Sequence, residues 1–467
     1  MEPESESELA PDSALAAASA LWPVDRSRVK AGHHCQRERF WEYHSYNGYG
    51  IRKVGEAVPL ATGIYVHEAL AGVLEICQRQ GYTEVPHPAD WAAEVQAVLG
   101  KVISKYDQVV KARGFTDDIL SGQVQATLQE QQALVIGLLW GWIRTTLPWV
   151  LAEFNIIAIE QEYTYVIGCS CGLGNGVGEV SDHVLRDCLG MMKMTRPDVI
   201  LERKSDGQLG YHEFKTAAQV GYSWEQEWKD NIQFALGALG AERIIGREVS
   251  HYYIHALIKG SRVKKDQDDS SSPRIQNSGL VYRWYRPGVP PVRKPEWKAL
   301  GGRWPGKDWD KIPIPQDEVA DWAYSGLDEE AVSKMFRIFG PYDRPTWLIG
   351  QVIEQIEANE ESWREKLDHY WGEAQDEIDR TGEPLPPAEN VSLLNRIFIP
   401  SWDCYKYGSK CQFFDLCHQV GGMWMDPVGS GQYAPRRPHH TPEVAQMIAR
   451  GVEVPVEVGD DDAGGDV

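Results

Sequence analysis

The chain has 467 residues, of which 42% are hydrophobic and 25% charged, a composition that is ordinary for a globular protein and argues against a fibrous or wholly disordered one. Its longest apolar run, Ala133–Ile143, spans 11 residues and is too short to cross a membrane, and the acidic N-terminus lacks the basic region of a signal peptide. The sequence therefore favours a cytoplasmic protein without a membrane partner.

The net charge of −21 argues at first against a nucleic-acid partner, but the charge is unevenly distributed. Residues 1–12 carry five acids and no base, and residues 451–467 carry six acids and no base. Residues 259–307 instead hold twelve Lys or Arg against four Asp or Glu, a local charge of +8. We predict disordered acidic segments at 1–24 and 431–467 around a folded region at 25–430.

Two helices are predicted near the start of the fold. A stretch rich in Arg and aromatic residues at 24–48 indicates a helix with Cys35 near its start. A second helix is expected over Ile64–Gln80, capped by Ala61-Thr62-Gly63 and buried through an apolar stripe. His67 lies at the edge of that stripe. Taken alone, such a histidine is more often a hydrogen-bonded core residue than a metal ligand.

Two long amphipathic helices follow, over Pro88–Arg113 and Thr116–Phe154, and form a helical insertion at about 85–155. The alternation of Ile156–Ile167 predicts one strand. Residues 168–178 predict a glycine-rich turn, and they lack the pattern of a phosphate-binding loop.

Four potential zinc ligands come after this strand: Cys169, Cys171, His183 and Cys188. They are the residue types of a small zinc site, but their spacing favours a hairpin with incidental thiols. The sequence leaves open whether they bind a second metal.

Residues 196–216 predict two short strands joined by a Ser-Asp-Gly turn. An antiparallel pairing brings Asp198, at the start of the first strand, opposite Glu213 on the second. Because strand side chains alternate, Glu213 and Lys215 point the same way and Phe214 points into the core. The converging charges suit a divalent metal with a Lys beside its bound water, and solvated charges on a surface hairpin are equally consistent.

A helix over Ser223–Ile245, containing Gln233, and a strand over His251–Lys259 complete the predicted core. The order of elements is helix, long helices, three strands, helix and strand. This mixture predicts an α/β (α+β) fold in which helices flank a central mixed sheet.

The basic segment 259–307 contains a predicted strand at Leu280–Tyr285 and several aromatic residues. Basic side chains contact phosphates and aromatic rings stack on bases, so the segment suits single-stranded nucleic acid. A surface insertion whose aromatic residues pack locally is equally consistent. The candidate DNA-binding residues are Lys259, Arg262, Arg283, Trp284, Arg286, Arg293, Lys294 and Trp304.

The C-terminal region, 315–420, is predicted to contain two helices and a group of cysteines. The helices are expected over Asp317–Phe339 and Tyr342–Glu377, and residues 359–366 are expected to form an exposed charged face on the second.

Three thiols, those of Cys404, Cys411 and Cys417, fall within fourteen residues. Iron–sulfur clusters usually take four thiolates, and Cys35 is an attractive fourth because it would join the two ends of the fold. A Cys3His zinc site and three unrelated thiols are the alternatives.

Six pieces occur in the order found in a known family: Cys35 before QRERFWEY, His67 in GIYVHEAL, Asp198 in RPDVI, Glu213-Phe214-Lys215, Gln233, and the C-terminal cysteine trio. The chain resembles the PD-(D/E)XK nuclease superfamily, in its RecB-like iron–sulfur branch. This branch includes AddB-type, CRISPR-adaptation and phage exonuclease-like nucleases. The matching pieces span nearly the whole chain, and the resemblance implies a central sheet of the restriction-endonuclease-like type.

The resemblance also implies roles for individual residues. His67, Asp198 and Glu213, with the backbone carbonyl of Phe214, would bind Mg²⁺ or Mn²⁺. Lys215 would act on the attacking water, so that Asp198, Glu213 and Lys215 would be catalytic.

Gln233 would help to position the substrate or the catalytic lysine, although Gly237 here replaces the tyrosine of the family's Gln-x-x-x-Tyr pattern. The resemblance further implies a 4Fe–4S cluster that joins the N- and C-terminal parts of the domain. Its ligands would be Cys35, Cys404, Cys411 and Cys417, with a longer Cys-x6-Cys spacing than in many relatives.

The implied function is a Mg- or Mn-dependent deoxyribonuclease, and an exonuclease that processes single-stranded or duplex DNA ends in phage recombination or repair is favoured. A CRISPR-adaptation-type nuclease that trims spacer precursors is the alternative enzyme. A non-cleaving DNA-binding or structural subunit is the alternative of another class. Because the sequence has no GxxxxGK[ST] loop, unwinding would require a helicase, recombinase or single-strand-binding partner.

Overall fold

A computed structural model gives the fold of residues 21–454 with several gaps. The gaps are 47, 55–57, 113–121, 175–179, 186–187, 189, 218–219, 230, 259–261, 264–273, 276–281, 287–288, 293–309, 314–334, 345, 402–403, 407–408, 421 and 439.

A five-stranded mixed sheet lies at the centre, in the order β14-β8-β7-β6-β3. Its strands are β3 (Phe154–Ile159), β6 (Val199–Arg203), β7 (Leu209–Ala217), β8 (Val249–Ile258) and β14 (Phe336–Asp343). Strands β7 and β8 run parallel, with α10 (Ile232–Ile245) between them in the chain, and the other neighbouring pairs are antiparallel. The predicted mixed sheet and α+β class are confirmed.

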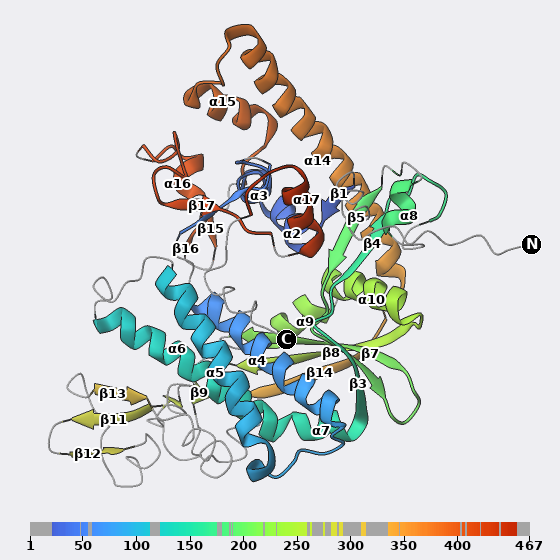
Figure 1. Cartoon of the computed structure of the whole chain (residues 1–467), viewed down its shortest axis with the longest axis vertical. Helices are drawn as coiled ribbons and strands as arrows, with labels where there is room; N and C mark the ends of the chain where they lie inside the picture. Colours follow the sequence, from blue (N-terminus) through green and yellow to red (C-terminus); the bar gives the residue numbers. More distant parts are fainter. Residues whose placement is uncertain are drawn as a thin grey trace, which may run out of the picture.

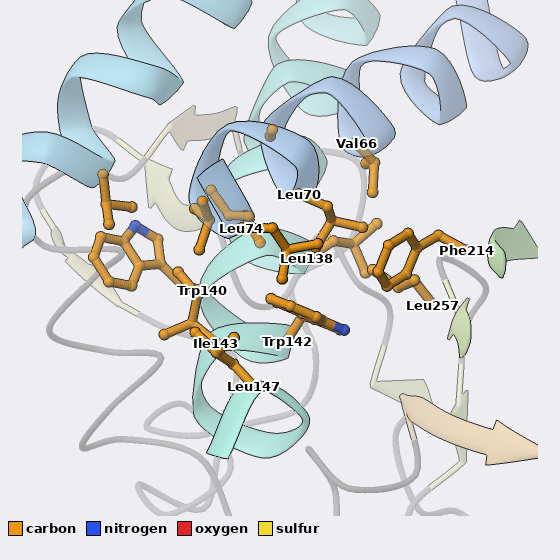
Figure 2. Close-up of a cluster of buried hydrophobic side chains, with 14 of the residues drawn as sticks. Val66, Leu70, Leu74, Leu138, Trp140, Trp142, Ile143, Leu147, Phe214 and Leu257 are labelled. Atoms are coloured by element: carbon orange, nitrogen blue, oxygen red, sulfur yellow. The ribbon is translucent and has the colours of Figure 1, made fainter. Parts of the chain in front are cut away.

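Helices cover one face of this sheet. They are α4 (Val58–Gln80), α5 (Pro88–Ala112), α6 (Gly122–Thr145) and α7 (Leu147–Glu153). Figure 2 shows Leu70 of α4 and Trp142 of α6 meeting Phe214 of β7 and Leu257 of β8 in one buried cluster. Full burial of each such side chain stabilises the fold by roughly 1.5–3 kcal/mol. Alternate residues of the same strands, including Tyr211, pack instead with α10 on the opposite face.

A smaller sheet has the order β1-β5-β4, with β1 (Trp22–Val24), β4 (Tyr163–Ile167) and β5 (Met191–Thr195). Strands β4 and β5 are antiparallel, and β1 runs parallel to β5. Figure 1 shows β4 and β5 leading away from the central sheet toward α8 (Val180–Leu185).

Helices from the two ends of the described chain lie side by side in the upper part of Figure 1, where blue α2 (Arg26–His34) and α3 (Gln36–Tyr43) meet red α17 (Thr441–Ala449). The buried Glu443 carboxylate of α17 accepts hydrogen bonds from Arg28 and Arg436. The Arg39 guanidinium likewise reaches the fully buried Glu360, with Arg39 Nη1 2.7 Å from Glu360 Oε1. Removing one partner of such a pair leaves a buried charge unpaired.

The remaining elements connect these parts. They are β2 (Ile51–Lys53), α9 (Tyr222–Lys229), β9 (Arg262–Val263), β10 (Arg274–Ile275), β11 (Tyr282–Arg286), β12 (Val289–Val292), β13 (Asp310–Pro313), α14 (Thr346–Thr381), α15 (Pro387–Ile397), β15 (Tyr405–Lys406), β16 (Ser409–Lys410), α16 (Phe414–Cys417) and β17 (Tyr433–Pro435).

Several predicted elements are divided. The strand predicted over 156–167 is two strands in two sheets, because Glu160 between them takes a left-handed φ of 45° that interrupts the extended chain. The helix predicted over 116–154 is interrupted after Thr145. A separate helix, α7, begins at Leu147 with Pro148 in its first turn, and Phe154 already belongs to β3. The helix predicted over 223–245 is α9 and α10, because the Asn231 side chain caps a new start.

Other predictions are wrong at their boundaries. The helix expected from residue 64 begins at Val58, so Thr62 lies inside it and hydrogen bonds to Tyr106 instead of capping. Of the helix predicted over 317–339, residues 317–334 lie outside the described residues, and Phe336 begins the edge strand β14 instead. In the predicted exposed face 359–366, Glu360 and Trp363 are buried.

Both predicted disordered segments are too long. Residues 22–24 form β1, because β5 offers them an open edge for pairing. Within 431–467, β17 pairs with β2 and α17 is anchored through Glu443. Residues 1–20 and 455–467 lie outside the described part of the chain.

Within the described ranges, none of the helices alone has the length and apolar character needed to cross a membrane. The pair Leu134–Thr145 and Leu147–Glu153 reaches that length and composition only together, across a bend of 43°.

Candidate metal sites

The first group of possible ligands lies at one end of β6. Asp198 directly precedes β6, His67 comes from α4, and Glu160 follows β3. One ligand atom of each lies within 4.8 Å of the others, so the group could hold a metal ion. His67 Nδ1 is 3.5 Å from Asp198 Oδ1, and the Phe214 N–H donates to Asp198 Oδ2 at 2.6 Å. The Phe214 backbone therefore lies at the site, as expected for a neighbour of the ligands.

The hairpin register agrees with the predicted approach of Asp198 to Glu213. Val199 pairs with His212, so the antiparallel ladder continues to Asp198 opposite Glu213. The buried Glu213 carboxylate accepts hydrogen bonds from Lys215 and from the Gln233 side chain. The Lys215 ammonium also lies 4.7 Å from the centre of the Trp228 ring. All four predicted catalytic residues thus fall in one neighbourhood.

Glu160 was not predicted from the sequence. Its backbone N–H donates to the Asp198 carbonyl at 2.9 Å, and Arg196 Nε lies 3.3 Å from its carboxylate. The polar run Glu160-Gln161-Glu162 breaks the apolar alternation of 156–167, and that interruption is the signal that could have revealed it. In the close group of ligand atoms, Glu160 occupies the place that was expected for Glu213.

His67, Asp198 and Glu160 shift one another's pKa values. Burial alone would lower the pKa of His67, but the Asp198 carboxylate outweighs it and raises that pKa. Burial would raise the pKa of Asp198, and His67 reverses the shift and lowers it. Burial and the charge of Asp198 together raise the pKa of Glu160 to about 7. A bound cation would relieve this repulsion between carboxylates.

The absence of a side chain at position 237 has a steric explanation. A Cβ there would lie 2.5 Å from the Tyr211 ring, so α10 can approach β7 only without a side chain at this position. The Tyr211 hydroxyl donates to the second oxygen of Glu213. The chain therefore supplies a tyrosine hydroxyl at the site from β7, although Gly237 stands in the tyrosine position on α10.

The second group of possible ligands lies in the loop between β4 and β5. Cys169 Sγ is 3.4 Å from Cys171 Sγ, and His183 Nδ1 is 3.5 Å and 3.4 Å from these two sulfurs. Cys188 completes the group, in which all ligand atoms lie within 4.8 Å. The expectation of incidental thiols in a hairpin is wrong in this respect, because α8 folds His183 back onto the thiols. These four residues could hold a metal ion.

Hydrogen bonds support Cys188 as a thiolate. Burial favours the neutral thiol, but hydrogen bonds from the Gly190 and Ser170 backbone and from His183 outweigh it and lower the pKa of Cys188 to about 6. The Gly190 N–H lies 3.4 Å from the Cys188 sulfur.

The C-terminal cysteines gather around the junction of α2 and α3. Cys35 separates these helices in an extended conformation, and its sulfur accepts a hydrogen bond from the Ser401 N–H at 3.4 Å. The Cys411 N–H donates to the Cys404 carbonyl at 2.8 Å. Burial raises the pKa of Cys411 to about 12, and the nearby Cys417 and Cys35 thiols add to the rise.

His418 is closer to this group than its sequence position indicates. Its Nε2 lies 3.6 Å from the Cys404 sulfur. Both the iron–sulfur prediction and the Cys3His alternative therefore remain predictions for this region.

The predicted DNA-binding residues fall largely outside the described structure. Arg283, Trp284 and Arg286 lie on β11 and Arg262 on β9, and only the backbone is described there. Lys259, Arg293, Lys294 and Trp304 are outside the described residues.

Comparison of the chain with protein-family models, curated proteins and solved structures finds no match. The function is therefore argued from the geometry of the sites themselves.

Proposed function

We propose that the chain is a divalent-metal-dependent nuclease that hydrolyses phosphodiester bonds in DNA. The observation that carries the proposal is the approach of Asp198, at the start of β6, to Glu213 and Lys215 on the adjacent strand, with His67 3.5 Å from Asp198. The order α4, β3, β6, β7, α10, β8 supports a sheet of the restriction-endonuclease-like type around them.

The donor set fits Mg²⁺ or Mn²⁺. Two carboxylates within 4.8 Å of each other and of an imidazole offer hard oxygen ligands and one nitrogen, and the imidazole favours Mn²⁺. Burial and the charge of Asp198 raise the pKa of Glu160 to about 7, and a bound cation would favour its charged form. Such a cation, when bound, supplies charge neutralisation at phosphate and a water of lowered pKa.

The protein side chains then orient the reaction. Asp198 and Glu160 would hold the cation beside the end of β6, and His67 would lend its neutral nitrogen. Lys215, fixed by Glu213 and the Trp228 ring, would donate to a phosphate oxygen or act on the attacking water. Gln233 and Tyr211 would fix the Glu213 carboxylate, since both donate to it.

The substrate is proposed to be DNA, as single strands or duplex ends. Support comes from the local charge of +8 over residues 259–307, which would attract the backbone that the acidic site repels. Binding through this segment should weaken steeply with rising salt.

The experiment is cleavage of end-labelled single- and double-stranded DNA with Mg²⁺ or Mn²⁺. Lys215→Ala should lower the rate by about 10²–10⁴-fold, the usual contribution of an acid–base group. Lys101→Ala, on the exposed side of α5, is the matched control and should cleave like wild type. Equal activity of wild type and Lys215→Ala contradicts the proposal, and binding without cleavage by wild type favours a non-cleaving subunit.

We also propose that Cys35, Cys404, Cys411 and Cys417 hold a 4Fe–4S cluster. The observation in support is that the N-terminal helices contact the segment that carries the cysteine trio. The Cys35 sulfur accepts a hydrogen bond from the Ser401 N–H at 3.4 Å, and Arg37 Nη1 donates to the Cys417 carbonyl at 3.4 Å. Because each thiolate of such a cluster binds a different iron, these sulfurs need not converge on a single point. Anaerobically purified protein should be brown and contain iron that is lost in Cys411→Ser. Zinc without iron in this region contradicts the proposal.

A further inference from the structure

The loop between β4 and β5 contains ligands that the proposed nuclease chemistry does not use. They are Cys169, Cys171, His183 and Cys188. His183 is fully buried on α8, Cys188 is buried before β5, and the two other cysteines are half-buried in the turn after β4. We infer that these four residues form a structural zinc site that ties the tip of the β4–β5 hairpin.

The distances match a tetrahedral ion. Zinc–sulfur bonds of about 2.3 Å and zinc–nitrogen bonds of about 2.0–2.1 Å place tetrahedral ligand atoms roughly 3.5–3.8 Å apart. The observed separations are 3.4 Å between the sulfurs of Cys169 and Cys171, and 3.4–3.5 Å from these sulfurs to His183 Nδ1. Donor atoms this close can all bind one ion. In a 4Fe–4S cluster, by contrast, each thiolate binds a different iron.

The chemistry of the ligands selects zinc. Three thiols and an imidazole are soft donors that disfavour Mg²⁺ and Ca²⁺. Four protein ligands close the coordination sphere, as in structural sites, and leave no position for a substrate. Outer contacts also orient the ligands, because the Gly190 N–H and the Ser170 hydroxyl both point to Cys188 Sγ, at 3.4 Å and 3.8 Å.

The backbone is built to bring the ligands together. Gly168 ends β4 with a φ of 62°, and its N–H donates to Glu357 of α14 at 2.9 Å. At Gly190, a Cβ would lie 2.7 Å from Val166 and 2.9 Å from the Ile167 carbonyl. Only glycine lets the start of β5 approach β4 closely enough to place Cys188 beside the turn.

The position of the loop indicates a structural role for the zinc site. Glu160 and Asp198 lie just outside the other end of the same hairpin, where Tyr163 pairs with Thr195. Five paired residues, at about 3.3 Å each, separate the two ends by roughly 17 Å. Zinc at the tip would hold β4 and β5 in register and so fix the strands that lead to these carboxylates.

Metal analysis of the full-length protein tests the inference without an activity assay. Wild type loaded with Zn²⁺ and then desalted should retain one zinc per chain. Cys169→Ser/Cys171→Ser should lose it, and Cys77→Ala, which removes a buried thiol from the main core, should retain it. Zinc that is absent from wild type, or present at full occupancy in the double variant, would overturn the site. Iron that depends on Cys171 would also overturn it.

A spectroscopic measurement covers the case in which the double variant does not fold. Apoprotein titrated with Co²⁺ should develop the visible bands of tetrahedral cobalt thiolate, and Zn²⁺ should abolish them. Octahedral cobalt spectra would contradict the four-ligand arrangement. Hydrogen exchange should be slower in β4 and β5 with zinc than without it, while α5 stays unchanged. Equal exchange in β4 and β5 would remove the stapling role.

Discussion

The β4–β5 hairpin has different ligands at its two ends. At its base, Glu160 and Asp198 with His67 offer mostly oxygen, and Glu213 nearby is already engaged by protein donors. At its tip, three thiols and one imidazole surround a single point. A hard, incomplete ligand set suits an exchangeable cation with room for water, and a soft, complete set suits a permanent one. The difference separates a site for chemistry from a site for structure on one supersecondary unit.

The largest effect is expected from Asp198→Asn. Asp198 is proposed to bind the cation directly. Substitution of a residue that only contacts a ligand costs roughly 10–100-fold in metal affinity, so the loss of Asp198 should weaken Mn²⁺ binding by more than this. The rate of cleavage should fall with the affinity. Calorimetric titration with Mn²⁺ measures the affinity. Zinc content should not change, because the tip does not use this carboxylate. A parallel loss of zinc would show that the two ends are not independent.

A smaller effect is expected from Glu160→Gln. If Glu160 is a ligand, Mn²⁺ affinity should fall by about 10-fold or more, again by calorimetry. Glu75→Gln, on an exposed position of α4, is the control. An unchanged affinity would return the third ligand position to Glu213 and make Glu160 a bystander at the base.

Gly237→Ala should disturb the packing around the residues at the base of the hairpin. Its Cβ would meet the Tyr211 ring at 2.5 Å, and overpacking of this kind costs about 1–3 kcal/mol. Gly100→Ala is the matched helical control, because a Cβ there meets nothing within 4 Å. Denaturant unfolding should show a loss for the first variant and a small gain for the second. Equal stability of Gly237→Ala and wild type would mean that Tyr211 is free to move away.

The smallest effect concerns pH. Burial, with the charge of Glu38, raises the pKa of Glu42 to about 7. The folded state therefore binds this proton more tightly than the unfolded state, so stability declines as the pH rises from about 4.5 through 7. Glu42→Gln should remove this decline.

The same profile measured with Mn²⁺ separates the base of the hairpin from Glu42. The pKa of Glu160 is also raised to about 7, and its share of the pH dependence, together with that of His67 and Asp198 beside it, should respond to the cation. Thermal unfolding in the Glu42→Gln background measures that share. A profile that Mn²⁺ leaves unchanged would argue against binding at Glu160.

Local patterns predicted the β6–β7 hairpin well, since alternation and a Gly turn fix the approach of Asp198 to Glu213 within a few residues. The four residues of the tip cluster were named from the sequence, but their approach to one another was not expected. It depends on α8, which returns His183 to the thiols, and the spacing of the residues does not reveal that fold. Glu160 was missed because the strand was expected to continue, whereas one left-handed residue moves the chain to another sheet. The sequence predicted an exposed Glu360. In the fold its carboxylate is enclosed by Arg39 and Trp22, which lie more than 300 positions earlier in the chain.

The pairing of Arg28 with Glu443 has a consequence for synthesis. The two residues are 415 positions apart, so α2 leaves the ribosome long before its partner exists. At roughly 5–20 residues per second, the delay is roughly 20–80 s. During that interval the Arg28 guanidinium lacks the Glu443 carboxylate that pairs with it in the fold. The contact between α2 and α17 can therefore form only after translation has passed α17.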